Sequence, residues 1–203
     1  MNYKTAAIII DQWDDSNEFN LLPKEHMLAD PGYQLVDNIK DYIDNSSDID
    51  LIILASYSVR SECLEKNEYN KNNLKVFGSA LYTEKIKQLY STSAAEERTD
   101  PRLIDWNTQK TKISMHFLWE LKIFLETNTV DNFFICGATF EGCLRDRPLG
   151  FESLYKFIIK HKLNSKIFIK KDLVLTESDL FFDSKKCPDW NMIDSDIFYY
   201  DPK

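Results

Sequence analysis

The chain has 203 residues, of which 43% are hydrophobic, and 25 basic against 33 acidic side chains give it a net charge of −8. This length suits one domain over residues 1–203, and no apolar run approaches the roughly 20 residues that cross a bilayer. The acidic balance argues against nucleic acid or an anionic membrane as a partner. Irregularly spaced cysteines and an N-terminal apolar run too short for a secretory signal predict a cytoplasmic protein with reduced thiols.

Short apolar runs alternate with amphipathic stretches along the chain, which is typical of βαβ units. The predicted strands are Ala6–Asp11, Leu51–Ser56, a weaker Leu103–Ile113, Asn132–Gly137 and Lys166–Ile169. The predicted helices are Gly32–Asp44, Thr83–Tyr90, Ser114–Glu126 and one that begins after Gly150 and stops at Asn164. We therefore expect an α/β fold with three layers, in which a mostly parallel, doubly wound, Rossmann-like sheet carries helices on both faces.

Two polar, weakly patterned segments, Asp14–Asp30 and Ser91–Thr108, are predicted loops, and loops of this length often cover a site. The tail from Cys187 to Lys203 is rich in aromatic residues, including Trp190. We expect it to dock on the domain as a final strand.

A glycine-bracketed turn that ends on a cysteine follows the fourth predicted strand. Gly137 and Gly142 stand where the backbone must bend sharply or approach another group closely, and Cys143 ends the turn. The carboxyl edge of a parallel sheet is the usual place for chemistry, so Cys143 is a candidate nucleophile. The alternative is a small buried hydrophobic residue, which is the expectation for Cys136 inside the strand.

Two charged residues are expected to join Cys143. Asp11 ends the first predicted strand, and right-handed crossovers bring the ends of strands one and four together. Lys110 lies near the end of the third predicted strand, although Lys112 has the same side-chain parity and is an alternative. A nearby cation stabilises a thiolate, and a carboxylate can accept its proton.

These motifs resemble those of the isochorismatase-like cysteine hydrolases. The shared features are an apolar strand ending in Asp-Gln at Ile8–Gln12, a Lys four residues before a Ser-x-aromatic-type helix start at Lys110–His116, and a strand followed by the turn Gly137–Cys143. Their order and intervals are similar to those of the family. The resemblance covers most of residues 5–169.

The resemblance implies roles for these residues. Cys143 is similar to the family nucleophile, Asp11 to its base and Lys110 to the cation that favours the thiolate. A cis peptide in the Gly-x-x segment is usual in the family, and the implied oxyanion donors are the backbone N–H groups of Ala138, Thr139 and Cys143.

The chain also departs from the family pattern. Phe140 stands where the family often has Thr, and Leu144–Gly150 replaces a direct helix start after the cysteine. The metal-binding Asp-x-His pattern of nicotinamidases is missing, because Ser56–Arg60 occupies that place. We therefore expect the metal-independent branch, with no metal and no cofactor.

Five residues around these motifs are candidate substrate-binding residues: Trp13, Phe19, His116, Phe140 and Arg145. Trp13 and Phe19 are expected either to wall the pocket or to make lid contacts only. His116 either lines the pocket or is simply half-buried. Arg145, like Arg147, either clamps a substrate carboxylate or forms a salt bridge with a neighbouring acid such as Asp146 or Glu152.

The resulting hypothesis is a homo-oligomeric cysteine hydrolase that acts on a small amide-like substrate, an ester or a vinyl ether. An alternative is a catalytically silent family member that serves as a binding or assembly protein. A third hypothesis, a dinucleotide-binding protein, is disfavoured because Asp11-Gln12-Trp13 follows the first strand in place of a glycine-rich phosphate loop.

Overall fold

The computed structural model describes residues 1–10, 29–55, 101–115, 118–176, 182–183, 185 and 187–202. The predicted helix Thr83–Tyr90 lies outside these residues, as do Asp11, Trp13, Phe19 and His116. Among the helices of the described ranges, none is both long enough and apolar enough to traverse a bilayer.

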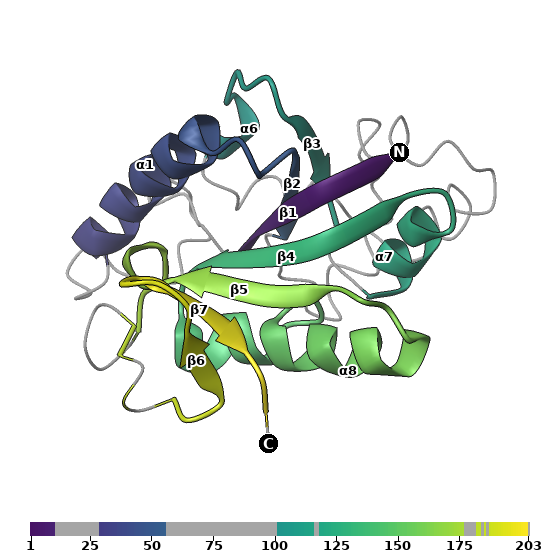
Figure 1. The fold of residues 1–203 in the computed structure, drawn as a ribbon. Coiled ribbons are helices and arrows are strands. Elements are labelled where there is room, and N and C mark those ends of the chain that lie inside the picture. The colour runs from purple at the N-terminus through teal and green to yellow at the C-terminus, as the bar shows by residue number, and fades with distance from the viewer. Residues whose placement is uncertain are drawn as a thin grey trace, which may run out of the picture.

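Seven strands form one mixed sheet in the order β3-β2-β1-β4-β5-β7-β6 (Figure 1). The first five strands in this order are parallel to one another, whereas β7 is antiparallel to both β5 and β6. The strands are β1 Asn2–Ile10, β2 Leu51–Ala55, β3 Thr111–Ser114, β4 Thr129–Gly137, β5 Lys166–Lys170, β6 Trp190–Met192 and β7 Ile197–Tyr200. The expected α/β class with a mostly parallel sheet is thus confirmed.

Helical segments connect and cover these strands. Figure 1 shows α1 on one side of the strands and α8 on the other. The α-helices are α1 Ala29–Asn45, α6 Pro101–Ile104, α7 Leu118–Leu125 and α8 Phe151–His161, with a π-helix η1 at Phe140–Leu144 and a 3-10 turn η2 at Lys171–Leu173.

The central strand β1 separates two hydrophobic clusters. Ile8 and Ile10 belong to one cluster, which also contains buried residues of α7 and α8, whereas Ala7 and Ile9 belong to the other, with residues of α1. Successive side chains of a strand point to opposite faces, so a continuous apolar run fits a strand that is buried on both sides. This explains why β2 and the second halves of β1 and β4 are almost uniformly apolar.

The predicted third strand requires correction. Residues 103–113 contain the end of the short helix α6, an irregular stretch and only the first part of β3, which begins at Thr111. Trp106 is buried and its indole N–H donates to Asp44 at 2.9 Å, so the apolar residues of this stretch pack on α1 instead of forming a strand. Lys110 therefore precedes the strand and does not end it.

The C-terminal tail forms one edge of the sheet. The tail forms the antiparallel hairpin β6–β7, so the expected docking is confirmed, with two strands in place of one. Helix α8 ends at His161, before the predicted Asn164, because Lys162 adopts the left-handed conformation with a φ of 53°.

Candidate functional site at the carboxyl end of β4

Gly137 ends β4 at the point where this strand passes the last residue of β1. It pairs with Ile10 and has a φ of +123°, a backbone conformation that residues with a side chain rarely adopt. A Cβ atom at this position would lie 2.1 Å from the Ile10 carbonyl oxygen. On its other side, the Leu175 N–H donates to the Gly137 carbonyl at 3.2 Å. The turn thus begins from a fixed position between two chain segments, and only glycine fits there.

The turn that follows leads directly into the π-helix η1. The peptide bond between Ala138 and Thr139 is cis, at the position that the family resemblance implies. The Thr139 carbonyl accepts hydrogen bonds from the N–H groups of Gly142 at 3.3 Å and Leu144 at 2.9 Å. Both residues that flank Cys143 in sequence are therefore tied to the start of the turn, which fixes the place of the cysteine.

Cys143 is half-buried, and a guanidinium group contacts its sulfur. Arg147 Nη2 lies 3.6 Å from Cys143 Sγ, and the Arg147 backbone N–H donates to the Cys143 carbonyl at 3.2 Å. Since arginine keeps its charge at all relevant pH values, this contact favours the thiolate over the thiol. A contact of Arg147 with the thiol is not among the sequence-based predictions, although residues four apart on a helical turn lie on one face.

Cys136 provides a contrast within the same strand and turn. Its side chain is fully buried, and its thiol is 3.7 Å from the Ile8 carbonyl oxygen. Burial raises the pKa of the Cys136 thiol, so this residue stays protonated and unreactive. The expectation that Cys136 belongs to the core is confirmed.

The two candidate lysines lie far from Cys143. Thr111, which follows Lys110, is level with Leu51, Ala6 and Phe133 across the sheet, and Gly137 is four residues further along β4. Lys110 is thus five residues from the level of Gly137, which at about 3.3 Å per residue is about 17 Å along the strands, in addition to three strand spacings across them. The predicted convergence of Lys110 with Cys143 is therefore corrected.

Both lysine side chains bind backbone carbonyl groups instead. Lys110 Nζ donates to Ser46 O at 2.7 Å. Lys112 Nζ donates to Leu103 O and Trp106 O, each at 3.0 Å, and burial lowers the pKa of this ammonium group. Their role is to hold the segment between α6 and β3 against the sheet edge.

The structure also places the predicted site residues Ala138 and Phe140. The Ala138 N–H is directed to Ile10 O at 3.4 Å, so this donor faces β1 and is not available for an oxyanion. Phe140 is only 7% exposed and stacks on Phe151, so it is a core residue and not a wall of a substrate pocket. Its N–H donates to Leu175 O at 2.8 Å.

Arg145 is exposed and forms a two-pronged contact with its neighbour Asp146. Arg145 Nε lies 2.8 Å from Asp146 Oδ1, and Nη2 lies 3.0 Å from Oδ2. The hydrogen bond to Arg145 lowers the pKa of Asp146, and the same bond raises the pKa of Arg145. The salt bridge with Asp146, one of the two alternatives for Arg145, is thus observed, whereas the substrate-clamp interpretation stays a prediction.

The base predicted for the site, Asp11, lies outside the described residues. It follows Ile10 directly in the sequence, and Ile10 is the partner of Gly137 at the carboxyl ends of β1 and β4. The candidate pocket residues Trp13, Phe19 and His116 also lie outside the described residues.

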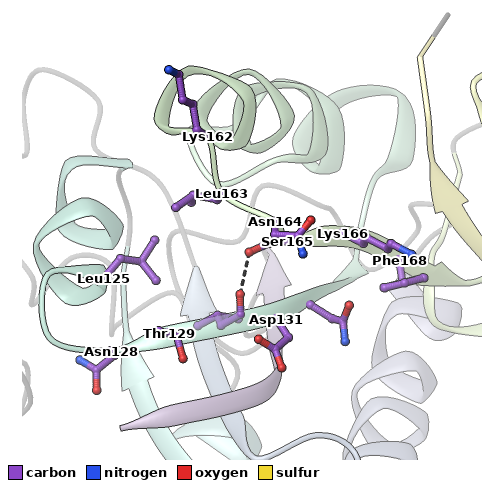
Figure 2. Close-up of a pocket in the computed structure, with 12 residues that line it drawn as sticks. Leu125, Asn128, Thr129, Asp131, Lys162, Leu163, Asn164, Ser165, Lys166 and Phe168 are labelled. Carbon is purple, nitrogen blue, oxygen red and sulfur yellow. Dashed lines mark hydrogen bonds between the residues drawn. The ribbon is translucent and has the colours of Figure 1, made fainter.

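A separate cavity of about 520 Å³ lies at the opposite, amino end of β4 and β5 (Figure 2). Two of its polar side chains bind backbone carbonyl groups of the protein: the Ser165 hydroxyl donates to Val130 O at 2.6 Å and the Asn128 amide to Phe124 O at 2.8 Å. In Figure 2 the Lys162 side chain extends away from the other labelled residues. Neither a cysteine nor a histidine is among the described residues that line this cavity.

Within the described ranges, His, Cys, Asp and Glu side chains nowhere gather in a group of three that could hold a metal ion. The chemistry that the described site can support is nucleophilic attack by Cys143, aided by the positive charge of Arg147. Comparison of the chain with protein-family models, with curated proteins and with solved structures gives no match.

Proposed function

We propose that this protein is a metal-independent cysteine hydrolase of the isochorismatase-like type, with Cys143 as the nucleophile and a small amide-like or ester substrate. The observation that carries the proposal is the position of the thiol. Cys143 follows the carboxyl end of a central parallel strand, and its sulfur lies 3.6 Å from the Arg147 guanidinium. Helices on the two sides of the sheet support the finer inference of a three-layer, doubly wound, Rossmann-like fold.

In the proposed mechanism, the Cys143 thiol transfers its proton to the Asp11 carboxylate, and the thiolate attacks the carbonyl carbon. The carbonyl oxygen becomes an oxyanion, for which the backbone N–H groups of Thr139 and Cys143 are the proposed donors. Collapse of this intermediate breaks the bond to the leaving group, which takes the proton from Asp11. Water then gives a proton to Asp11 and attacks the acyl-enzyme, and the thiolate leaves.

Arg147 takes the electrostatic role that the family resemblance implies for Lys110. A guanidinium differs from an ammonium group in that it stays charged and cannot serve as a proton donor at neutral pH. Proton transfer in the proposed cycle therefore depends on Asp11 alone, and Arg147 stabilises negative charge on sulfur. We also infer a cytoplasmic homo-oligomer.

A second candidate function is a binding or assembly protein that retains the fold without turnover. It is favoured by the position of Lys110 and Lys112, whose ammonium groups bind backbone carbonyls at the other end of the sheet. The segment after Cys143 adds to this case, because Arg145 is paired with Asp146 at the surface.

Acyl-enzyme trapping tests the proposal against this alternative. The wild-type protein and the Cys143→Ala variant are mixed with p-nitrophenyl acetate, quenched in acid and analysed by intact mass and peptide mapping. We expect one acetyl group on Cys143 in the wild type, and a burst of p-nitrophenol that the variant lacks. Equal release by both proteins, with no acetyl group on Cys143, would favour the non-catalytic function.

A further inference from the structure

A groove of about 440 Å³ lies between α7 and α8, which pack against each other on one side of the sheet (Figure 1). Its lining residues recur at helical spacing along both helices, as Leu118 and Lys122 do on α7 and Phe157 and His161 do on α8. The groove is distinct from the Cys143 turn, since none of its described lining residues belongs to η1 or to β4. Its volume falls in the range of small-molecule sites.

The base of the groove is apolar and aromatic. Phe157 is 7% exposed, and the half-buried Leu118 and Trp119 face the same space. The His161 ring lies on Phe157 with a centroid separation of 4.4 Å, which extends the flat surface. Aromatic side chains of this kind offer an apolar contact area to a ring or a branched hydrocarbon at low entropic cost.

The rim of the groove carries charge of one sign. Lys122, Lys156 and Lys160 line it with exposed side chains, and none of its described lining residues is acidic. This is notable in a chain with 33 acidic and 25 basic side chains. Lys156 also lies 3.6 Å from Glu152, but the two side chains are 77% and 38% exposed, so water screens this pair.

We propose that the groove between α7 and α8 binds a small amphipathic organic anion. The apolar, preferably aromatic body of the ligand lies on Leu118, Trp119 and Phe157, and its carboxylate or comparable anionic group faces Lys156 and Lys160. Charge complementarity and volume together favour this occupant over a macromolecule. The proposal does not depend on the hydrolase function, because it uses none of the residues around Cys143.

A displacement titration with the full chain tests the proposal. The fluorescent anion 8-anilinonaphthalene-1-sulfonate is bound first and is then displaced with 2-naphthoate or with 2-naphthamide, which has the same ring system without the charge. We expect the carboxylate to displace the probe at a concentration about tenfold lower than the amide, because only the carboxylate interacts with the lysine rim.

Two double variants locate the binding site. Lys156→Glu with Lys160→Glu reverses the rim charge and should weaken 2-naphthoate binding about tenfold or more. Lys166→Glu with Lys185→Glu makes the same change in net charge at exposed lysines outside the groove and should leave binding within about twofold. Circular dichroism establishes that both variants are folded.

Three results would overturn the proposal. One is equal displacement by the carboxylate and the amide, and another is an equal loss of binding in the two double variants. The third is a wild-type oligomer, seen by sedimentation velocity, that Lys156→Glu with Lys160→Glu dissociates while neither protein binds 2-naphthoate. This last result would make the groove an interface between copies of the chain.

Discussion

Gly137 is the residue at which the backbone of the candidate site is most constrained. The change Gly137→Ala would force an alanine into a φ of +123° and bring its Cβ to 2.1 Å from Ile10 O. We expect a loss of about 4 kcal/mol or more in the free energy of unfolding, because backbone on both sides must move. Urea denaturation followed by circular dichroism measures this loss.

Gly142→Ala is the matched control for this prediction. A Cβ there would meet only the Thr139 side-chain oxygen at 3.3 Å, and the residue lies within a helical turn where alanine is favoured over glycine. We expect the free energy of unfolding to change by no more than about 1 kcal/mol. Similar losses of unfolding free energy in the two variants would contradict the close contact of Gly137 in β4 with the Ile10 carbonyl group in β1.

The individual site residues were predictable to different degrees. Cys143 stands out in the sequence because glycines flank it after an apolar strand, and that signal is local. Arg147 lies four residues after Cys143, a spacing that places two side chains on one face of a helical turn, whereas the family pattern indicates Lys110 as the cation. The burial of Phe140 depends on Trp190 and Phe182, which are distant in sequence, so no local pattern indicates it.

At the scale of elements, an aromatic cluster joins η1 to α8 and the C-terminal hairpin. Phe140 lies at its centre, with ring centroids 5.1 Å from Phe151, 4.9 Å from Phe182 and 6.0 Å from Trp190. The hairpin therefore does more than extend the sheet, because Trp190 at the start of β6 packs against the π-helix that carries Cys143. Through this contact between Trp190 and Phe140, the C-terminal hairpin supports the helical turn that carries the candidate nucleophile.

Phe140→Ala should destabilise the fold by about 3–5 kcal/mol, since it removes a buried ring from this cluster and leaves a cavity. Ile159→Ala is the control, because Ile159 on α8 is 60% exposed, and we expect a change within about 0.5 kcal/mol. Chemical denaturation of both variants provides the measurement. A loss for Phe140→Ala as small as that of the control would refute its central place in the cluster.

The strands differ in how far the sequence predicts them. β2 and the second halves of β1 and β4 are continuous apolar runs because both faces are buried there, and the predicted ranges cover these runs. The first residues of β1 and β4 include polar ones and lie outside the predicted ranges. β3 contains a single large apolar residue, Ile113, among polar ones, so its start was placed too early. The predicted range Leu103–Ile113 has Lys110 near the carboxyl end of the strand, whereas Lys110 directly precedes the amino end of β3.

At the scale of the whole molecule, the fold should lose stability in alkali. Burial and, to a smaller extent, the charge of Glu152 raise the pKa of Tyr200 to about 12 from an ordinary 10.0. Between these values the unfolded chain has released the phenol proton while the folded chain still holds it. The contribution of Tyr200 is therefore complete below about pH 10 and is lost as the pH rises to about 12.

Tyr200→Phe should reduce this fall in the free energy of unfolding across the same pH window. Lys112 has the opposite effect: its pKa is lowered in the folded protein, so the free energy of unfolding rises with pH between its folded and unfolded pKa values. Because both proteins contain Lys112, the difference between them gives the effect of Tyr200 alone. Urea midpoints measured at several pH values give both slopes. Parallel slopes for wild type and Tyr200→Phe would contradict the prediction.

The two ends of the parallel strands have different roles in the molecule as a whole. At the amino end, Lys110, Ser165 and Asn128 make hydrogen bonds that close the fold, whereas the carboxyl end holds the half-buried turn with Cys143 and Arg147. The sequence predicts the carboxyl end as the reactive one from topology alone. It does not predict which cation is present there, because that depends on the conformation of η1.

The most direct test of the account is the rate of iodoacetamide alkylation of each cysteine against pH, resolved by peptide mass spectrometry. Cys143 should react with an apparent pKa below about 8.5 and faster than Cys187, and Arg147→Gln should move that value back toward 8.5 while Arg145→Gln leaves it unchanged. A Cys143 thiol that titrates near 8.5 in all three proteins, and reacts no faster than Cys187, would contradict the assignment of Cys143 as a nucleophile.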